Sequence, residues 1–209
     1  MCGIETFRRL YTVGGSNLTD NLTMMTYEDY EALLEGPRGK YYEGRWEYFK
    51  EVLKIIQKEE FTKVIELGPG LLPIIKNSDV IVNPKEDAFG KPDKIRGRVF
   101  AFDATQKPWP INDKQYDLFI ALQVWEHLDN KQSRAFREVM RISKTAVLSF
   151  PYNWEGGEEE KPSHRAHRFI DKELIEDWTL GVKPEKVIEI PRTGPEFDKG
   201  PRLIYFWRF

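Results

Sequence analysis

The sequence has a single cysteine, Cys2, and no long hydrophobic segment among its 209 residues. One cysteine cannot form a disulfide within the chain, which agrees with a reducing compartment. No apolar run approaches the roughly 18 residues that cross a bilayer. The first residues also lack the basic-then-apolar order of a signal peptide. We therefore expect a cytoplasmic protein without a membrane partner.

An excess of charge of either sign is also missing. The chain has 32 basic and 34 acidic residues and a formal net charge of −2. A protein that coats nucleic acid or an anionic membrane usually carries a marked positive excess, so neither partner is expected. The hydrophobic share of 40% and the charged share of 32% are ordinary for a water-soluble globular protein. The length suits one domain with a full core.

The N-terminal part lacks a sustained hydrophobic period. Residues 1–42 contain the loop signals Gly14-Gly15-Ser16-Asn17 and Gly36-Pro37-Arg38-Gly39. We expect an irregular arm or lid there, with a short helix over residues 27–34. A domain over residues 43–209 follows, and it opens with an amphipathic helix over residues 43–58.

Short apolar runs bounded by turn signals predict seven strands in the rest of the chain. The expected strands cover residues 63–67, 79–82, 98–102, 116–121, 145–150, 186–190 and 202–207. Helices are expected over residues 130–142, with Asp129 as N-cap and Gln132 as its capping-box partner, and over residues 171–180. This alternation predicts a doubly wound, mostly parallel α/β sheet. The last two strands follow one another through a hairpin-like loop, so one of them should run antiparallel.

The turn after the first strand is the first candidate ligand site. Residues 64–70 read Val-Ile-Glu-Leu-Gly-Pro-Gly. In open α/β sheets ligands bind beyond the carboxyl ends of strands, where glycine lets the backbone approach closely. The third glycine of the dinucleotide pattern is missing, which disfavours a nicotinamide-dependent oxidoreductase. The acid Glu66 suits a ligand with a positive charge and hydroxyl groups.

Several further motifs follow in a fixed order. They are Asp103-Ala104, Pro108-Trp109-Pro110, Tyr116-Asp117-Leu118 and Trp125-Glu126-His127-Leu128. Together with the acid–Gly–x–Gly turn, this order resembles the class I S-adenosylmethionine (SAM)-dependent methyltransferases, in particular their small-molecule branch. The resemblance covers roughly residues 43–150. It implies a Rossmann-like sheet of seven strands with an antiparallel last strand, and SAM as cofactor.

The resemblance also implies roles for individual residues. Glu66, Gly68 and Gly70 would face the methionine portion of SAM, with Glu66 near its ammonium group. Asp103 would accept a hydrogen bond from the adenine amino group, and the Ala104 N–H would donate to the ring. We therefore expect these residues to lie together at one edge of the sheet.

Other positions carry weaker implications. Gln123, after the fourth strand, would offer backbone groups near the methionine end. Trp109 would either cover the adenine face or pack in the core. Family members usually hold the ribose with an acid after the second strand, where this chain has Asn83, and Asp87 is a candidate substitute. The usual helix between the second and third strands is expected to be reduced, since residues 84–97 have little helical signal.

The acceptor side offers candidate bases. His164 and His167 follow the fifth strand, and a histidine there has a pKa suited to proton removal. The alternative is that both are surface histidines without a role. A metal site with Glu158–Glu160 is not expected, because consecutive glutamates are typical of a solvated face.

These patterns predict a SAM-dependent methyltransferase acting on an unidentified small-molecule acceptor. The alternative is a catalytically inactive protein of the same fold that binds a partner or senses the cofactor. Asn83 in place of an acid favours that alternative, whereas retention of Glu66, Gly68, Gly70 and Asp103 opposes it. Nucleic-acid methylation is less expected, because the Asn/Asp-Pro-Pro-aromatic tetrapeptide is missing.

Overall fold

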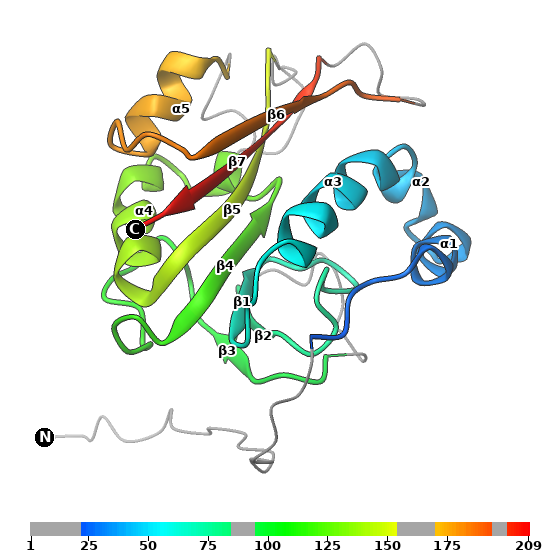
Figure 1. Ribbon diagram of the computed structural model, residues 1–209, viewed down its shortest axis with the longest axis horizontal. Coiled ribbons are helices and arrows are strands. Elements are labelled where there is room, and N and C mark those ends of the chain that lie inside the picture. Colours follow the sequence, from blue (N-terminus) through cyan, green and yellow to red (C-terminus); the bar gives the residue numbers. More distant parts are fainter. Residues whose placement is uncertain (1–21, 85–94, 154–169, 194–199) are drawn as a thin grey trace, which may run out of the picture.

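One mixed sheet forms the centre of the protein (Figure 1). The computed structural model describes residues 22–84, 95–153, 170–193 and 200–209. The strand order is β3-β2-β1-β4-β5-β7-β6, and β7 runs in the direction opposite to that of the other six strands. The strands are β1 Val64–Leu67, β2 Asp79–Val82, β3 Val99–Ala101, β4 Tyr116–Leu122, β5 Ser143–Pro151, β6 Lys186–Ile190 and β7 Arg202–Arg208.

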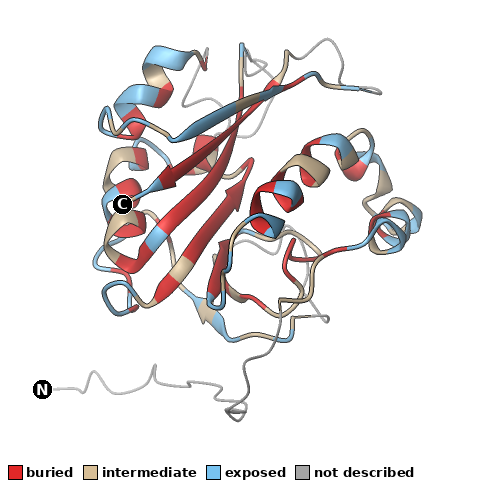
Figure 2. Ribbon diagram, viewed as in Figure 1, coloured by how far each residue is buried: buried red, intermediate tan, exposed pale blue. Residues whose placement is uncertain are grey.

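Helices cover both faces of this sheet, as a doubly wound fold requires. The helices are α1 Tyr27–Glu35, α2 Gly39–Tyr42, α3 Trp46–Gln57, α4 Gln132–Ile142 and α5 Lys172–Trp178, and a short 3-10 helix, η2, spans Trp125–His127. The first three helices pack on one face and share its hydrophobic core, whereas α4 and α5 pack on the other. The central strands β4 and β5 are buried along most of their length (Figure 2).

The sequence patterns predicted most of these elements. All seven strands lie where expected, and the antiparallel β7 confirms the expectation for the last pair. The predicted N-cap of α4 was wrong. Asp129 and Asn130 have positive φ angles of 47° and 60°, and α4 begins at Gln132 after Lys131, which makes no side-chain cap. An N-cap needs an extended backbone, so the left-handed Asp129 cannot serve as one.

The N-terminal segment packs where a helix usually follows the first strand. The β1–β2 connection, residues 68–78, contains no helix. Instead, the Met25 N–H donates to the Ile74 carbonyl at 2.8 Å, and the Lys76 N–H donates to the Thr23 carbonyl at 2.7 Å. Met25 is buried in the same core as α3. Whether residues 1–42 act as a lid stays a prediction.

No described helix has both the length and the apolar character needed to cross a bilayer.

Candidate functional site

The turn after β1 contains two glycines in the left-handed region. Gly68 has φ +61° and Gly70 has φ +66°, and we call residues 68–70 the Gly turn. The Gly68 N–H donates to the Ile81 carbonyl at 3.0 Å, which holds the turn against β2. A Cβ atom at Gly68 would lie 3.0 Å from Cγ2 of Val124, which follows β4. Both the backbone angle and this close approach explain why glycine is needed there.

Glu66 lies on β1 with its carboxyl buried beside the next loop. Its Oε2 accepts a hydrogen bond from the Ile74 N–H at 2.9 Å, and the residue is only 2% exposed. Burial raises the pKa of Glu66 to about 8, although hydrogen bonds from the N–H groups of Ile74 and Ile75 oppose the rise. The side chain therefore anchors the loop that replaces a helix. Its contact with a cofactor ammonium group stays a prediction.

A tyrosine from the N-terminal segment reaches the residue after the Gly turn. The Tyr42 hydroxyl accepts a hydrogen bond from the Leu71 N–H at 3.0 Å. The Tyr30 hydroxyl in turn donates to the Tyr42 carbonyl at 2.8 Å. The Tyr42 hydroxyl thus satisfies the Leu71 N–H, and Tyr30 helps to hold Tyr42 in place.

The turn after β3 holds the second pair of predicted site residues, and we call residues 102–105 the Asp103 turn. Asp103 Oδ1 accepts hydrogen bonds from the Thr105 N–H at 2.9 Å and from Thr105 Oγ1 at 2.7 Å. Asp103 Oδ2 and the Ala104 N–H bond to none of the residues that the structure describes. One carboxylate oxygen thus fixes the turn, and an acceptor and a donor remain on neighbouring residues.

Gln123 directly follows β4 and has a strained conformation. Its φ is +56°, a left-handed angle that costs a non-glycine residue about 1 kcal/mol or more. Ser149 on β5 stabilises it: the Gln123 N–H lies 3.0 Å from the Ser149 Oγ, and Nε2 lies 3.2 Å from the same atom. Strain of this kind concentrates at functional sites. Gln123 lies at the carboxyl edge of the sheet because it follows β4, and a backbone contact with a cofactor stays a prediction.

The remaining predicted residues fall in two groups. Asn83 follows β2 at the same edge of the sheet and is half-buried. Asp87, His164 and His167 lie outside the described residues, as does Glu158–Glu160, so their roles stay predictions. Among the described residues, no group of three or more His, Cys, Asp or Glu side chains is placed to hold a metal ion.

Two tryptophans near the site belong to the core. Trp109 is 2% exposed and stacks on Phe119, with ring centroids 5.8 Å apart. This confirms the packing alternative for Trp109. Trp125 is 1% exposed and lies edge-on to Phe119 and Phe136.

Comparisons with known proteins place this geometry in context. No family model matches the chain, and no curated protein matches it by sequence. Solved structures do match. The N-methyltransferase NodS from Bradyrhizobium japonicum WM9, solved with S-adenosylhomocysteine (SAH), is 14% identical with a TM-score of 0.59, covering 87% of this chain and 97% of that one. A SAM-dependent methyltransferase from Thermotoga maritima, a possible histamine N-methyltransferase, is 16% identical with a TM-score of 0.55, covering 87% and 98%.

A third similar structure bears the name of a different reaction. The [4+2]-cyclase SpnF is 14% identical with a TM-score of 0.50, covering 70% of this chain and 73% of that one. Strand order, helix layers and these neighbours together show that the chain has the class I SAM-dependent methyltransferase fold. Because folds host several chemistries, the reaction has to be argued from the site.

Proposed function

We propose that this protein is a SAM-dependent methyltransferase that acts on a small-molecule acceptor. The observation that carries the proposal is the Asp103 turn, at the carboxyl end of β3. There, a carboxylate oxygen and a backbone N–H on neighbouring residues match the amino group and ring nitrogen of adenine. A scaffold without a ligand has no need of this pair.

The other residues at this edge suit the rest of the cofactor. Gly68 and Gly70 of the Gly turn offer backbone that carries no Cβ atom to the methionine portion. The Asn83 amide can accept one hydrogen bond from a ribose hydroxyl and donate another, but it adds no charge. Gln123 would contribute backbone groups near the methionine end.

Methyl transfer asks little covalent chemistry of the protein. SAM, when bound, supplies an electrophilic methyl group on a sulfonium sulfur. The chain has to align the acceptor in line with that methyl group and keep water away. An acceptor that must lose a proton early needs a base, and His164 or His167 would supply it. Arg165 and Arg168 in the same segment would suit a polar or anionic acceptor, and unchanged activity after replacing both would contradict that assignment.

The first test is calorimetric titration with SAM and SAH. Asp103→Asn is the sharpest variant, because its amide oxygen can still accept from Thr105 while its NH₂ group replaces the free acceptor. We expect micromolar binding by the wild type and a loss of at least about ten-fold in the variant. Asp171→Asn is the matched control, since it makes the same change at an aspartate that accepts a backbone N–H, from Leu174 at 2.8 Å, at the start of α5. A folded wild type that binds neither ligand would refute the proposal.

A second candidate function is cofactor sensing or partner binding without catalysis. Asn83, where the family usually has an acid, favours it, and SpnF shows that neighbours of this fold bear names of other reactions. An enzyme and a cofactor sensor both require SAH binding, whereas a folded protein that binds neither SAM nor SAH would fit the partner-binding alternative. Turnover separates the enzyme from the sensor: only an enzyme releases SAH from SAM when it is offered a panel of small-molecule acceptors.

A further inference from the structure

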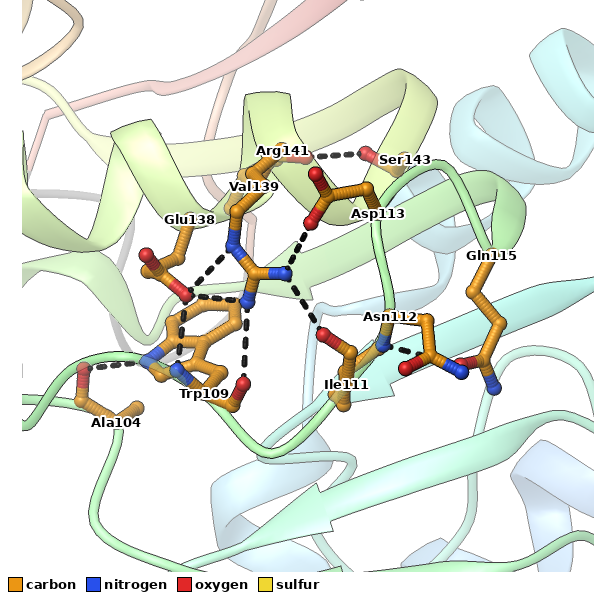
Figure 3. Close-up of polar contacts among 10 residues, drawn as sticks. All are labelled: Ala104, Trp109, Ile111, Asn112, Asp113, Gln115, Glu138, Val139, Arg141 and Ser143. Carbon is orange, nitrogen blue, oxygen red and sulfur yellow. Dashed lines mark hydrogen bonds and ion pairs between the residues drawn. The ribbon is translucent and has the colours of Figure 1, made fainter.

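One buried side chain contacts the Asp103 turn on both sides of Asp103. The Trp109 Nε1–H donates to the Ala104 carbonyl at 3.2 Å (Figure 3). The Trp109 ring also packs against the ring of Phe102, with centroids 5.8 Å apart. The residues before and after Asp103 are therefore both held by the same indole.

The backbone of Trp109 is fixed by helix α4. Its N–H donates to Glu138 Oε2 at 2.8 Å, and its carbonyl accepts from Arg141 Nη2 at 3.1 Å. Arg141 Nη2 also donates to Glu138 Oε2, at 2.6 Å. Figure 3 shows these bonds converging on Trp109. The indole thus connects the Asp103 turn to a rigid helix.

Arg141 extends the same connection along the loop before β4. Its Nη1 donates to the Ile111 carbonyl and to Asp113 Oδ1, both at 2.7 Å. Burial opposes ionisation of Glu138, but hydrogen bonds from Arg141 and the Trp109 N–H outweigh it and lower the pKa of Glu138. A charged Glu138–Arg141 pair therefore holds a loop, residues 102–115, that contains no helix of its own.

We infer that Trp109 is a positioning residue that sets the adenine selectivity of the Asp103 turn, with Glu138 and Arg141 holding the indole in place. The inference rests on the proposed function. Recognition of an amino group beside a ring nitrogen needs the Asp103 carboxylate and the Ala104 N–H in one plane and at one spacing. Loosening Ala104 at its carbonyl would let the Ala104 N–H shift, and this would weaken the match to adenine more than it weakens binding in general.

The test compares two ligands that differ at the adenine edge. S-inosylhomocysteine has a carbonyl in place of the amino group of SAH and a protonated ring nitrogen, so it mismatches both groups of the turn. We expect Trp109→Phe, which keeps an aromatic ring but lacks the N–H, to lower the preference for SAH about five-fold, as for one lost hydrogen bond. Trp207→Phe is the matched control: Trp207 is also buried, and its Nε1–H donates to the Val182 carbonyl at 2.9 Å. It should leave the preference unchanged.

Two additional measurements make the result decisive. Glu138→Gln keeps the shape of the side chain that holds Trp109 and should also lower the preference for SAH over S-inosylhomocysteine. This variant tests the positioning role if Trp109→Phe does not fold. Amide exchange of residues 102–106 without ligand should be faster in Trp109→Phe than in Trp207→Phe.

An unchanged preference in folded Trp109→Phe, or an equal fall in both tryptophan variants, would overturn the inference. If the wild type bound neither ligand, the proposed function would fall, and the exchange rates alone would then decide the positioning role.

Discussion

Replacing Glu66 by glutamine should make the protein more stable at neutral pH. The Glu66 carboxyl is 2% exposed, and burial raises its pKa to about 8 from an ordinary value of 4.5. In the folded protein it therefore keeps its proton at neutral pH, whereas in the unfolded chain it loses that proton above pH 4.5. Since the unfolded state then binds fewer protons, the free energy of unfolding falls as pH rises. A glutamine oxygen can still accept a hydrogen bond from the Ile74 N–H. Because glutamine does not titrate, the loss of stability with rising pH disappears in the variant.

The size of the effect follows from the pKa difference. Each unit of pKa difference is worth about 1.4 kcal/mol, so the wild type loses about 3 kcal/mol between pH 5 and pH 7 through this group alone. The loss should continue until the folded-state pKa near 8 is reached. The stability of Glu66→Gln relative to the wild type should therefore rise by about 3 kcal/mol over the same interval.

Urea unfolding of both proteins at several pH values between 5 and 8 measures this directly. The difference between the two proteins cancels the titration of every group they share. A stability difference that stays constant over this range would show that Glu66 is already ionised in the folded protein. The argument from burial would then be refuted, and the carboxylate would be available at neutral pH for a cationic ligand without cost.

Two further predictions concern stability. Asp117 accepts hydrogen bonds from Thr62 and Lys144, and although burial opposes ionisation, these bonds lower its pKa. Asp117→Asn should therefore lower the free energy of unfolding by about 2 kcal/mol at pH 7, and this difference should shrink as the pH falls below about 4. A difference in urea unfolding that is the same at every pH would contradict this. Gly68→Ala should lower the free energy of unfolding by about 1–2 kcal/mol in the same assay, because φ is +61° and the new methyl group would crowd Val124. It should also weaken SAH binding, and a variant as stable as the wild type would show that the Gly turn adjusts freely.

Local patterns were enough to predict the sheet. Each strand is a short apolar run closed by turn residues, and β6 lies over the expected residues, Lys186–Ile190. The start of α4 could not be placed the same way. Asp129 and Asn130 belong to residue types that favour helix caps but also tolerate left-handed backbone, and the structure uses the second property.

The candidate site was predictable where it depends on chain order. The carboxyl ends of parallel strands meet at one edge, so Gly68, Asp103 and Gln123 lie at the same edge of the sheet as expected, and their roles toward a cofactor stay predictions. The supporting contacts were not predictable. The Leu71–Tyr42 and Trp109–Glu138 hydrogen bonds each join residues 29 positions apart. They hold the connections after β1 and β3, which contain no helix over residues 68–78 and 102–115, and no local period signals contacts of this kind.

The place of β7 in the sheet has a consequence for synthesis of the chain. β7 lies between β5 and β6, although both precede it in sequence. Until residues 202–208 have left the ribosome, β5 is paired on one side only, and β6 has no partner in the described sheet. Unpaired strand edges invite pairing with other chains. The nascent protein thus carries unpaired edges on β5 and β6 until β7 emerges, and this part of the sheet closes only once residues 202–208 have been made.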